Sequence, residues 1–262
     1  MINFFKGLLC GIGNIIPGVS GSALLIIMDI YEKCITSITE LLKLRNIKKN
    51  IIFLIPIAIG IVIGTVLFGN FIKFFLNKYP MPTTYIFFGL ILGTIPFLFR
   101  KASKEKFSIK NIPILLFTMG LGIVLMLFGS NVNQPQNIGD IQKIICGFVL
   151  ASSTIIPGIS STVLLSLIGV YDVYLEAIIV LDVAFLIPVI IGFSIGLTIF
   201  SLLINYLLKK FYSYTYYGII GFLMTTMPTV IKGEISNNFI SLISILLLIL
   251  SFLITYYLSG KE

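Results

Sequence analysis

The sequence contains no histidine, few charged residues and only three cysteines. The lack of histidine excludes a histidine general base, a phosphohistidine and the usual zinc sites. A glycine-rich phosphate loop with a lysine is also missing. An enzyme is therefore the least favoured class of protein. If the chain were an enzyme, its catalysis would have to use carboxylates alone or a serine and a lysine. We expect no catalytic residue, no metal site and no cofactor.

Charged residues make up only 11% of the chain and hydrophobic residues 58%, with a mean hydropathy of +1.10. A soluble fold of 262 residues cannot bury so much apolar surface, so we expect an all-α, multi-pass membrane protein. Strand-length segments with alternating polarity are missing, which argues against an outer-membrane barrel. A spanning helix needs ~20 apolar residues. Six are predicted, at 51–72, 83–99, 111–129, 183–208, 216–231 and 238–258.

Cys10, Cys34 and Cys146 are odd in number and lie in or beside apolar segments, which predicts packing and not disulfides. The formal charge of +8 would suggest a nucleic-acid partner in a soluble protein. Here the bases gather in short loops, where they indicate topology, and we expect no such partner. A cleavable signal is not expected, because Lys6 is the only early base and glycines and Pro17 interrupt the apolar run.

One string of residues occurs twice in the chain. Ile-Ile-Pro-Gly followed by hydroxyl-bearing residues occupies positions 15–22 and again 155–162, an offset of 140. A tyrosine and an acid follow at equal distance, as Tyr31-Glu32 and Tyr171-Asp172. A helix-breaking Pro-Gly in apolar sequence is typical of irregular backbone that binds a substrate inside a membrane.

Further matches extend the duplication at an offset of 132. They pair Pro56, Gly60 and Gly64 with Pro188, Gly192 and Gly196, and Gly89 and Pro96 with Gly221 and Pro228. We therefore expect two homologous repeats, 1–130 and 140–262, joined near the polar segment 130–137.

Loop charges predict how the repeats are oriented. Basic residues fill the loops at 43–49 and 100–110 and occur again at 209–210, which places these loops and both termini in the cytoplasm. The stretches 130–140 and 172–182 lack bases and are expected outside. Residues 4–38 and 144–175 would then each form a re-entrant hairpin bent at Pro-Gly. Three spanning helices after each hairpin give an inverted-topology repeat, although two full crossings in place of each hairpin would leave the same loops.

If both hairpin tips point to the midplane, the helices after Pro17 and Pro157 direct free N–H groups and positive dipole ends to the centre. Glycines there permit close approach of the backbone, and hydroxyls donate to phosphate or carboxylate oxygens. The alternative is that Pro-Gly only kinks a helix and small residues pack helices closely. The predicted phosphate site consists of Gly18, Ser20, Gly21, Ser22, Gly158, Ser160, Ser161 and Thr162.

Acids and tyrosines near the hairpins are candidates for ion coupling or head-group contacts. Asp29, Glu32 and Asp172 lie within or at the end of apolar sequence, where an unpaired charge is expensive and a raised pKa would allow proton coupling. The alternative is that these acids simply lie at the membrane–water interface, where their charges are solvated. Tyr31 and Tyr171 could donate hydrogen bonds to a head group, although tyrosine is common at membrane interfaces.

The two Pro-Gly-hydroxyl strings, within 6–32 and 147–172, make the chain resemble the bacterial and archaeal polyprenyl-phosphate transporter family over nearly its whole length. It departs from that family's pattern at Asn14, where an acid is common, and at Asp29 and Ser161, where glycine is usual. Ser22-Ala23 also replaces the usual Gly-Thr. These positions keep small or polar residues.

The resemblance implies a flippase that returns undecaprenyl phosphate from the outer to the cytoplasmic leaflet of the cell membrane, recycling the lipid carrier of cell-wall synthesis. Its implied partners are a lipid-phosphate substrate, membrane lipids and a coupling ion, proton or sodium. A secondary transporter of a small soluble anion is the alternative. A lateral opening to lipid beside the hairpins would favour the flippase, and a closed aqueous vestibule the alternative.

Overall fold

The computed structural model describes residues 2–14, 21–103, 109–129, 138–180, 182–230 and 239–258. Within these ranges the regular structure is entirely helical, as the composition predicted. The helices in chain order are α1 (Ile2–Asn14), α2 (Gly21–Ile27), α3 (Tyr31–Leu42), α4 (Ile47–Lys78), α5 (Pro80–Ala102), the 3₁₀-helix η1 (Ile109–Asn111), α6 (Ile112–Gly129), α7 (Asp140–Ile155), α8 (Ser161–Leu167), α9 (Tyr171–Ile179), α10 (Val183–Lys210), α11 (Tyr212–Val230) and α12 (Phe239–Leu258).

All six predicted spanning segments are helical. In the described part of the chain, four helices are long and apolar enough to cross a membrane: α4, α5, α10 and α12. The apolar part of α6 is shorter, and α11 has 19 residues with a tyrosine-rich first half. Length and composition therefore support a multi-pass membrane protein with four candidate spans.

The second predicted hairpin segment is a broken helix, and the first contains helices on both sides of residues that the structure does not describe. In the second, α7 ends at Ile155 and α8 begins at Ser161, so the break falls at Pro157-Gly158, as predicted. In the first, α1 ends at Asn14 and α2 begins at Gly21, and Pro17-Gly18 lies outside the described residues. Helices α2 and α8 have only seven residues each.

Each hairpin segment also contains a third helix, because the chain turns again after α2 and α8. Asp29 has φ 50° and Gly169, 140 positions later, has φ 69°. The N–H groups of residues 29 and 30 donate to the carbonyls of 26 and 25, and those of 169 and 170 donate to 166 and 165. Both turns are therefore Schellman C-caps, whose left-handed position favours glycine. That preference accounts for the glycine expected where Asp29 stands.

Glycines let two helix pairs approach closely. Helix α1 packs on α4, where Gly7 faces the backbone of Ile57 and Gly60 faces that of Phe4. Helix α7 packs on α10, where Gly147 faces Val189 and Gly192 faces Ile144. A Cβ at any of these glycines would collide with backbone of the facing helix. The contacts of the second pair repeat those of the first, at offsets of 140 for α1 and 132 for α4.

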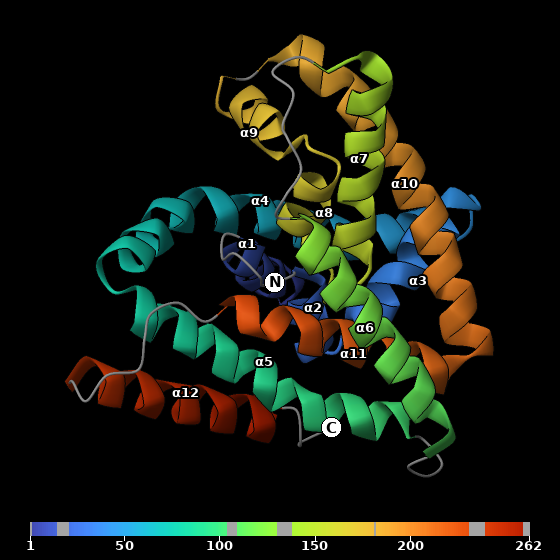
Figure 1. Cartoon of the computed structure of the whole chain (residues 1–262). Helices are drawn as coiled ribbons and strands as arrows, with labels where there is room; N and C mark the ends of the chain where they lie inside the picture. The colour runs from blue at the N-terminus through green and yellow to red at the C-terminus, as the bar shows by residue number, and fades with distance from the viewer. Residues whose placement is uncertain are drawn as a thin grey trace.

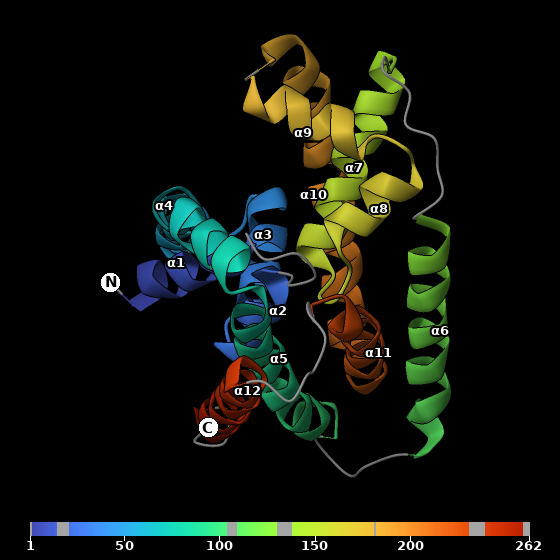
Figure 2. The ribbon, with the colours of Figure 1, turned by 60° about the vertical axis from the view of Figure 1, so that its left-hand side comes forward.

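Two further helix pairs, α5–α12 and α6–α11, join residues far apart in sequence. Helix α12 packs on α5, with Gly89 against the backbone of Leu248, and α6 packs on α11, with Gly221 against that of Leu115. Figures 1 and 2 show α5 and α12 side by side, with α7 and α10 forming a separate upright pair. Each last helix, α6 or α12, thus lies against a helix from the other predicted repeat.

The main hydrophobic core joins residues of α2 to α7, α10 and α11. Leu98, Tyr216, Tyr217 and Ile220 are fully buried there. A second cluster around Leu165 and Val170 joins α7, α8, α9 and α10. The three cysteines are buried and free, which confirms the predicted packing role.

Candidate functional site

The break between α7 and α8 is pressed against α11. Gly158 is buried with φ +86°, and a Cβ on it would lie 2.5 Å from the backbone nitrogen of Leu223. A left-handed conformation and close backbone contact both require glycine at this position. Ser160, at this break, precedes α8 in extended conformation and is half-buried.

A small pocket lies at the break between α7 and α8. Gly158, Ile159 and Ser160 line it together with Thr225 and Thr226 of α11 and residues of α6. Its volume of about 20 Å³ holds roughly one water molecule, which is too small for a phosphate group. The Thr225 hydroxyl donates to the carbonyls of Met119 and Gly221, both at 3.0 Å. The Thr225 hydroxyl is therefore already hydrogen-bonded to backbone carbonyls.

The other predicted phosphate-binding residues are only partly visible. Gly18 and Ser20 lie outside the described residues. Gly21 begins α2, and Ser22 is buried in that helix. Ser161 begins α8, and the backbone of Thr162 follows in the same helix. The site stays a prediction.

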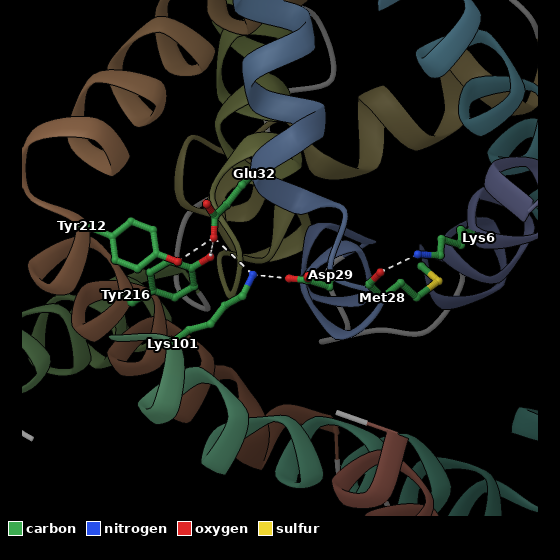
Figure 3. A network of polar contacts seen from close by, with 7 residues as sticks. All are labelled: Lys6, Met28, Asp29, Glu32, Lys101, Tyr212 and Tyr216. Atoms are coloured by element: carbon green, nitrogen blue, oxygen red, sulfur yellow. Dashed lines mark hydrogen bonds and ion pairs between the residues drawn. The ribbon is translucent and has the colours of Figure 1, made fainter. Parts of the chain in front are cut away.

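Asp29 and Glu32 meet a lysine and two tyrosines from distant helices (Figure 3). Lys101 at the end of α5 forms ion pairs with Asp29 and with Glu32, the latter at 3.2 Å. Tyr212 and Tyr216 of α11 both donate to the same Glu32 oxygen, Tyr212 at 2.8 Å. We call these five residues the Glu32 network. It ties the first hairpin segment to α5 and α11.

The network keeps Glu32 ionised. Glu32 lies outside the four candidate spans, at the start of α3. Burial by itself raises the pKa of Glu32, but hydrogen bonds from Tyr216 and Tyr212 and the charge of Lys101 outweigh it. The net pKa of Glu32 is therefore below the ordinary value.

Tyr31 connects the two hairpin segments directly. Its side chain is 2% exposed, and its hydroxyl donates to the carbonyl of Ile155 at 2.9 Å. Ile155 is the last residue of α7, next to the break. The start of α3 and the second break therefore lie together.

Tyr171 and Asp172 lie elsewhere. Both belong to the first turn of α9. Tyr171 packs against the second hydrophobic cluster, whereas Asp172 is exposed. The structure therefore brings Tyr31 to the second break and places Asp29 and Glu32 in the Glu32 network, whereas Tyr171 and Asp172 lie at the start of α9.

A larger, apolar cavity of about 530 Å³ lies between α6, α10 and α11. Leu207, Phe211 and Gly218 are among the residues that line it, and Phe222 lines both this cavity and the small pocket at the tip. Leu203 lines it as well and is 45% exposed, so the cavity reaches the outer surface. Among the described residues, α6 packs on α11 and α8 but makes few contacts with α10, so the cavity lies along a seam between two helices.

Sequence reasoning missed Lys101, Tyr212, Tyr216, Thr225 and Thr226. Lys101 was interpreted only as a topology signal, because its contact with Glu32 spans 69 residues of chain. A usable signal existed for Thr226: a threonine two residues before a helix proline occurs at Thr94 and again 132 positions later. The described residues hold no group of three or more His, Cys, Asp or Glu that could bind a metal ion.

Comparison with known proteins identifies the family. Residues 10–241 match the family described as undecaprenyl phosphate translocase-like. A polyprenyl-phosphate transporter of Staphylococcus aureus is 30% identical over 270 residues, which covers 97% of this chain and 94% of that protein. A polyprenyl-phosphate transporter of Vibrio cholerae is 29% identical over 241 residues, 87% of this chain and 76% of that protein. No solved structure matches the chain. The family match includes both Pro-Gly strings, at 15–22 and 155–162, and the chain belongs to the undecaprenyl phosphate translocase-like family of membrane transporters.

Proposed function

We propose that this protein moves polyprenyl phosphate, such as undecaprenyl phosphate, from the outer to the cytoplasmic leaflet and so recycles the carrier lipid of cell-envelope synthesis. One observation carries the proposal: a small pocket at the second break, whose lining includes the hydroxyl-bearing residues Ser160, Thr225 and Thr226, adjoins a large apolar cavity, and Phe222 is common to both. Such a pairing suits an amphiphile, whose head and tail need opposite surroundings. A soluble anion would have no use for the apolar cavity or its opening to the surface.

The proposed architecture is two inverted repeats, 1–130 and 140–262. The equal offsets of the glycine contacts in α1–α4 and α7–α10 support a duplication. So do the matching Schellman turns at residues 29 and 169. An alternating-access transporter needs two such halves that move around a central site.

The proposed orientation keeps the basic loops and both termini in the cytoplasm. The pKa of Glu40 is lowered, chiefly by hydrogen bonds from Asn50 and Asn46 and further by the charges of Lys49 and Lys209. The loop before α4 and the end of α10 thus lie at one end of the molecule. Both were assigned to the cytoplasm from their charge, and their proximity supports that assignment.

In the proposed transport state the head-group phosphate binds between the two Pro-Gly segments. Because α2 and α8 are so short, their dipoles contribute less than a long helix would, and hydroxyls must supply much of the binding. Ser20 and Ser160 provide one such hydroxyl on each side. Opening of the tip from α11 would also free Thr225 and Thr226 to donate.

Ion coupling belongs to the same proposal. Glu32 is the proposed proton carrier, and it takes up a proton only in the state in which Tyr212, Tyr216 and Lys101 have moved away. Formation of the Glu32 network would then release that proton and tie the first hairpin to α11. Sodium binding to the freed Asp29 and Glu32 carboxylates is the alternative coupling step.

The test is leaflet-resolved translocation of labelled undecaprenyl phosphate in proteoliposomes, with and without a pH gradient. We expect protein-dependent movement that falls at least tenfold in Ser20→Ala/Ser160→Ala. Ser194→Ala is the matched control, because its exposed hydroxyl donates only within α10, to Ile190. If inserted protein moves no lipid but carries inorganic phosphate or small carboxylates, the protein is a soluble-anion transporter and the proposal is wrong.

A further inference from the structure

The apolar cavity between α6, α10 and α11 has two different ends. At one end Phe222 joins it to the pocket at the hairpin tip. At the other end Phe211 and Tyr214 line it, where α10 ends and α11 begins. Phe211 and Phe222 are about 16 Å apart along the helix, at 1.5 Å per residue. The cavity therefore runs from the hairpin tip to one end of α11.

A lysine marks the second end. The ammonium group of Lys210 lies 5.4 Å from the ring centre of Phe211 and 5.5 Å from that of Tyr206. Lys210 is exposed, and no carboxylate in the described ranges lies within ion-pair distance of it. Lys209 stands next to it. The apolar cavity thus ends near the positive charge of Lys210, which makes a cation–π contact with Phe211 in the cavity wall.

We propose that this end of the cavity is a second head-group site, which binds a polyprenyl phosphate of the adjacent leaflet. The phosphate lies at Lys210, and the isoprenoid units nearest to it occupy the space between α6, α10 and α11. This inference rests on the proposed function for its substrate class. It adds a second binding site, separate from the one proposed at the hairpin tip, at the membrane surface where the lipid enters or leaves the protein.

The chemistry of the site fits that ligand on three counts. An ammonium group and a phosphate form a charge-assisted hydrogen bond, which is stronger than a neutral one. Leu203, Leu207 and Phe222 bury apolar units of the tail, each buried methylene contributing about 0.8 kcal/mol. The seam between α6 and α10 reaches the outer surface at Leu203, so the remainder of a long tail can stay in lipid.

Gly218 offers a way to block the tail without disturbing the head-group end. A Cβ on Gly218 would lie 3.5 Å from Thr118 and 3.8 Å from Ile114, which are ordinary contacts, so alanine fits. Leucine at the same position extends into the cavity that Gly218 lines. Gly218→Leu should therefore exclude an isoprenoid chain, and Gly218→Ala should impair binding much less.

The experiment is photolabelling of purified full-length protein with a diazirine-tailed geranylgeranyl phosphate, followed by mass-spectrometric mapping. We expect labels on α6, α10 and α11, competition by geranylgeranyl phosphate, and at least tenfold weaker competition by geranylgeraniol and by inorganic phosphate. Lys210→Gln should lower the affinity about tenfold, and Lys210→Arg should retain it. Lys78→Gln removes another exposed base that also lies over aromatic rings, those of Phe74 and Tyr79, on a helix that does not line the cavity, and should change nothing.

Labels outside these helices, or equal affinity in Lys210→Gln and wild type, would overturn the site. Because binding in detergent is measured apart from translocation, the two proposals can fail separately. Lipid movement with labels elsewhere refutes only the second head-group site. Labels in the cavity without lipid movement refute only the proposed lipid transport and leave the site standing.

Discussion

Gly158 is the residue on which the break between α7 and α8 depends. Its left-handed φ disfavours any side chain by about 1–2 kcal/mol. A Cβ would in addition meet the backbone of Leu223, which cannot move without displacing α11. We expect Gly158→Ala to lower the thermal midpoint in detergent by several degrees. Gly120→Ala, where the Cβ meets nothing within 4 Å, is the control and should not melt lower than wild type.

Glu32 gives the protein a defined acid sensitivity. Because its folded pKa is lowered, its stabilising effect is fully present above the unfolded pKa of about 4.3 and is lost as pH falls through the folded value. The difference in thermal midpoint between wild type and Glu32→Gln should be largest above about pH 5 and should vanish below the folded pKa. Tyr212→Phe/Tyr216→Phe removes two donors and should shift this loss to higher pH. A pH-independent difference would contradict the assignment.

At the scale of helices, single glycines set how closely α6 and α11 approach. A Cβ on Gly221 would lie 2.5 Å from the carbonyl oxygen of Leu115, a backbone atom that cannot yield. Gly221→Ala should therefore separate α6 from α11 and lower the thermal midpoint well below that of Gly218→Ala, one turn away. Gly89→Ala should do the same to α5 and α12, where the facing atom is the Leu248 carbonyl. Equal midpoints for the alanine variants at 218 and 221 would show that this contact does not hold the pair together.

The sequence predicted the long helices and the second break because hydropathy and Pro-Gly are local signals. It did not predict the third helix of the first hairpin segment, since Asp29 has a side chain where a left-handed turn favours glycine. Lys101 was out of reach for another reason: its partners Asp29 and Tyr216 are brought together only by helix packing. The apolar cavity depends on how far α6 lies from α10, and nothing in either helix encodes that distance by itself.

For the whole molecule, the proposed orientation can be checked by cysteine labelling in intact cells. The natural cysteines are at most 4% exposed, so background reaction with a membrane-impermeant maleimide should be low. Asp140→Cys and Asp172→Cys should react from outside, whereas Lys48→Cys should react only after permeabilisation. These three positions are exposed in the structure. External labelling at position 48 would reverse the proposed orientation.

The pairing of α12 with α5 bears on how the protein is made. Helix α5 is synthesised early, yet its Gly89 groove is filled by the last helix of the chain. During translation α5 therefore lacks its partner helix, and lipid or the insertion machinery must cover the groove until residues 239–258 have been synthesised. A chain truncated before α12 would expose that groove permanently and become a substrate for membrane quality control, although most of its helices had already been inserted.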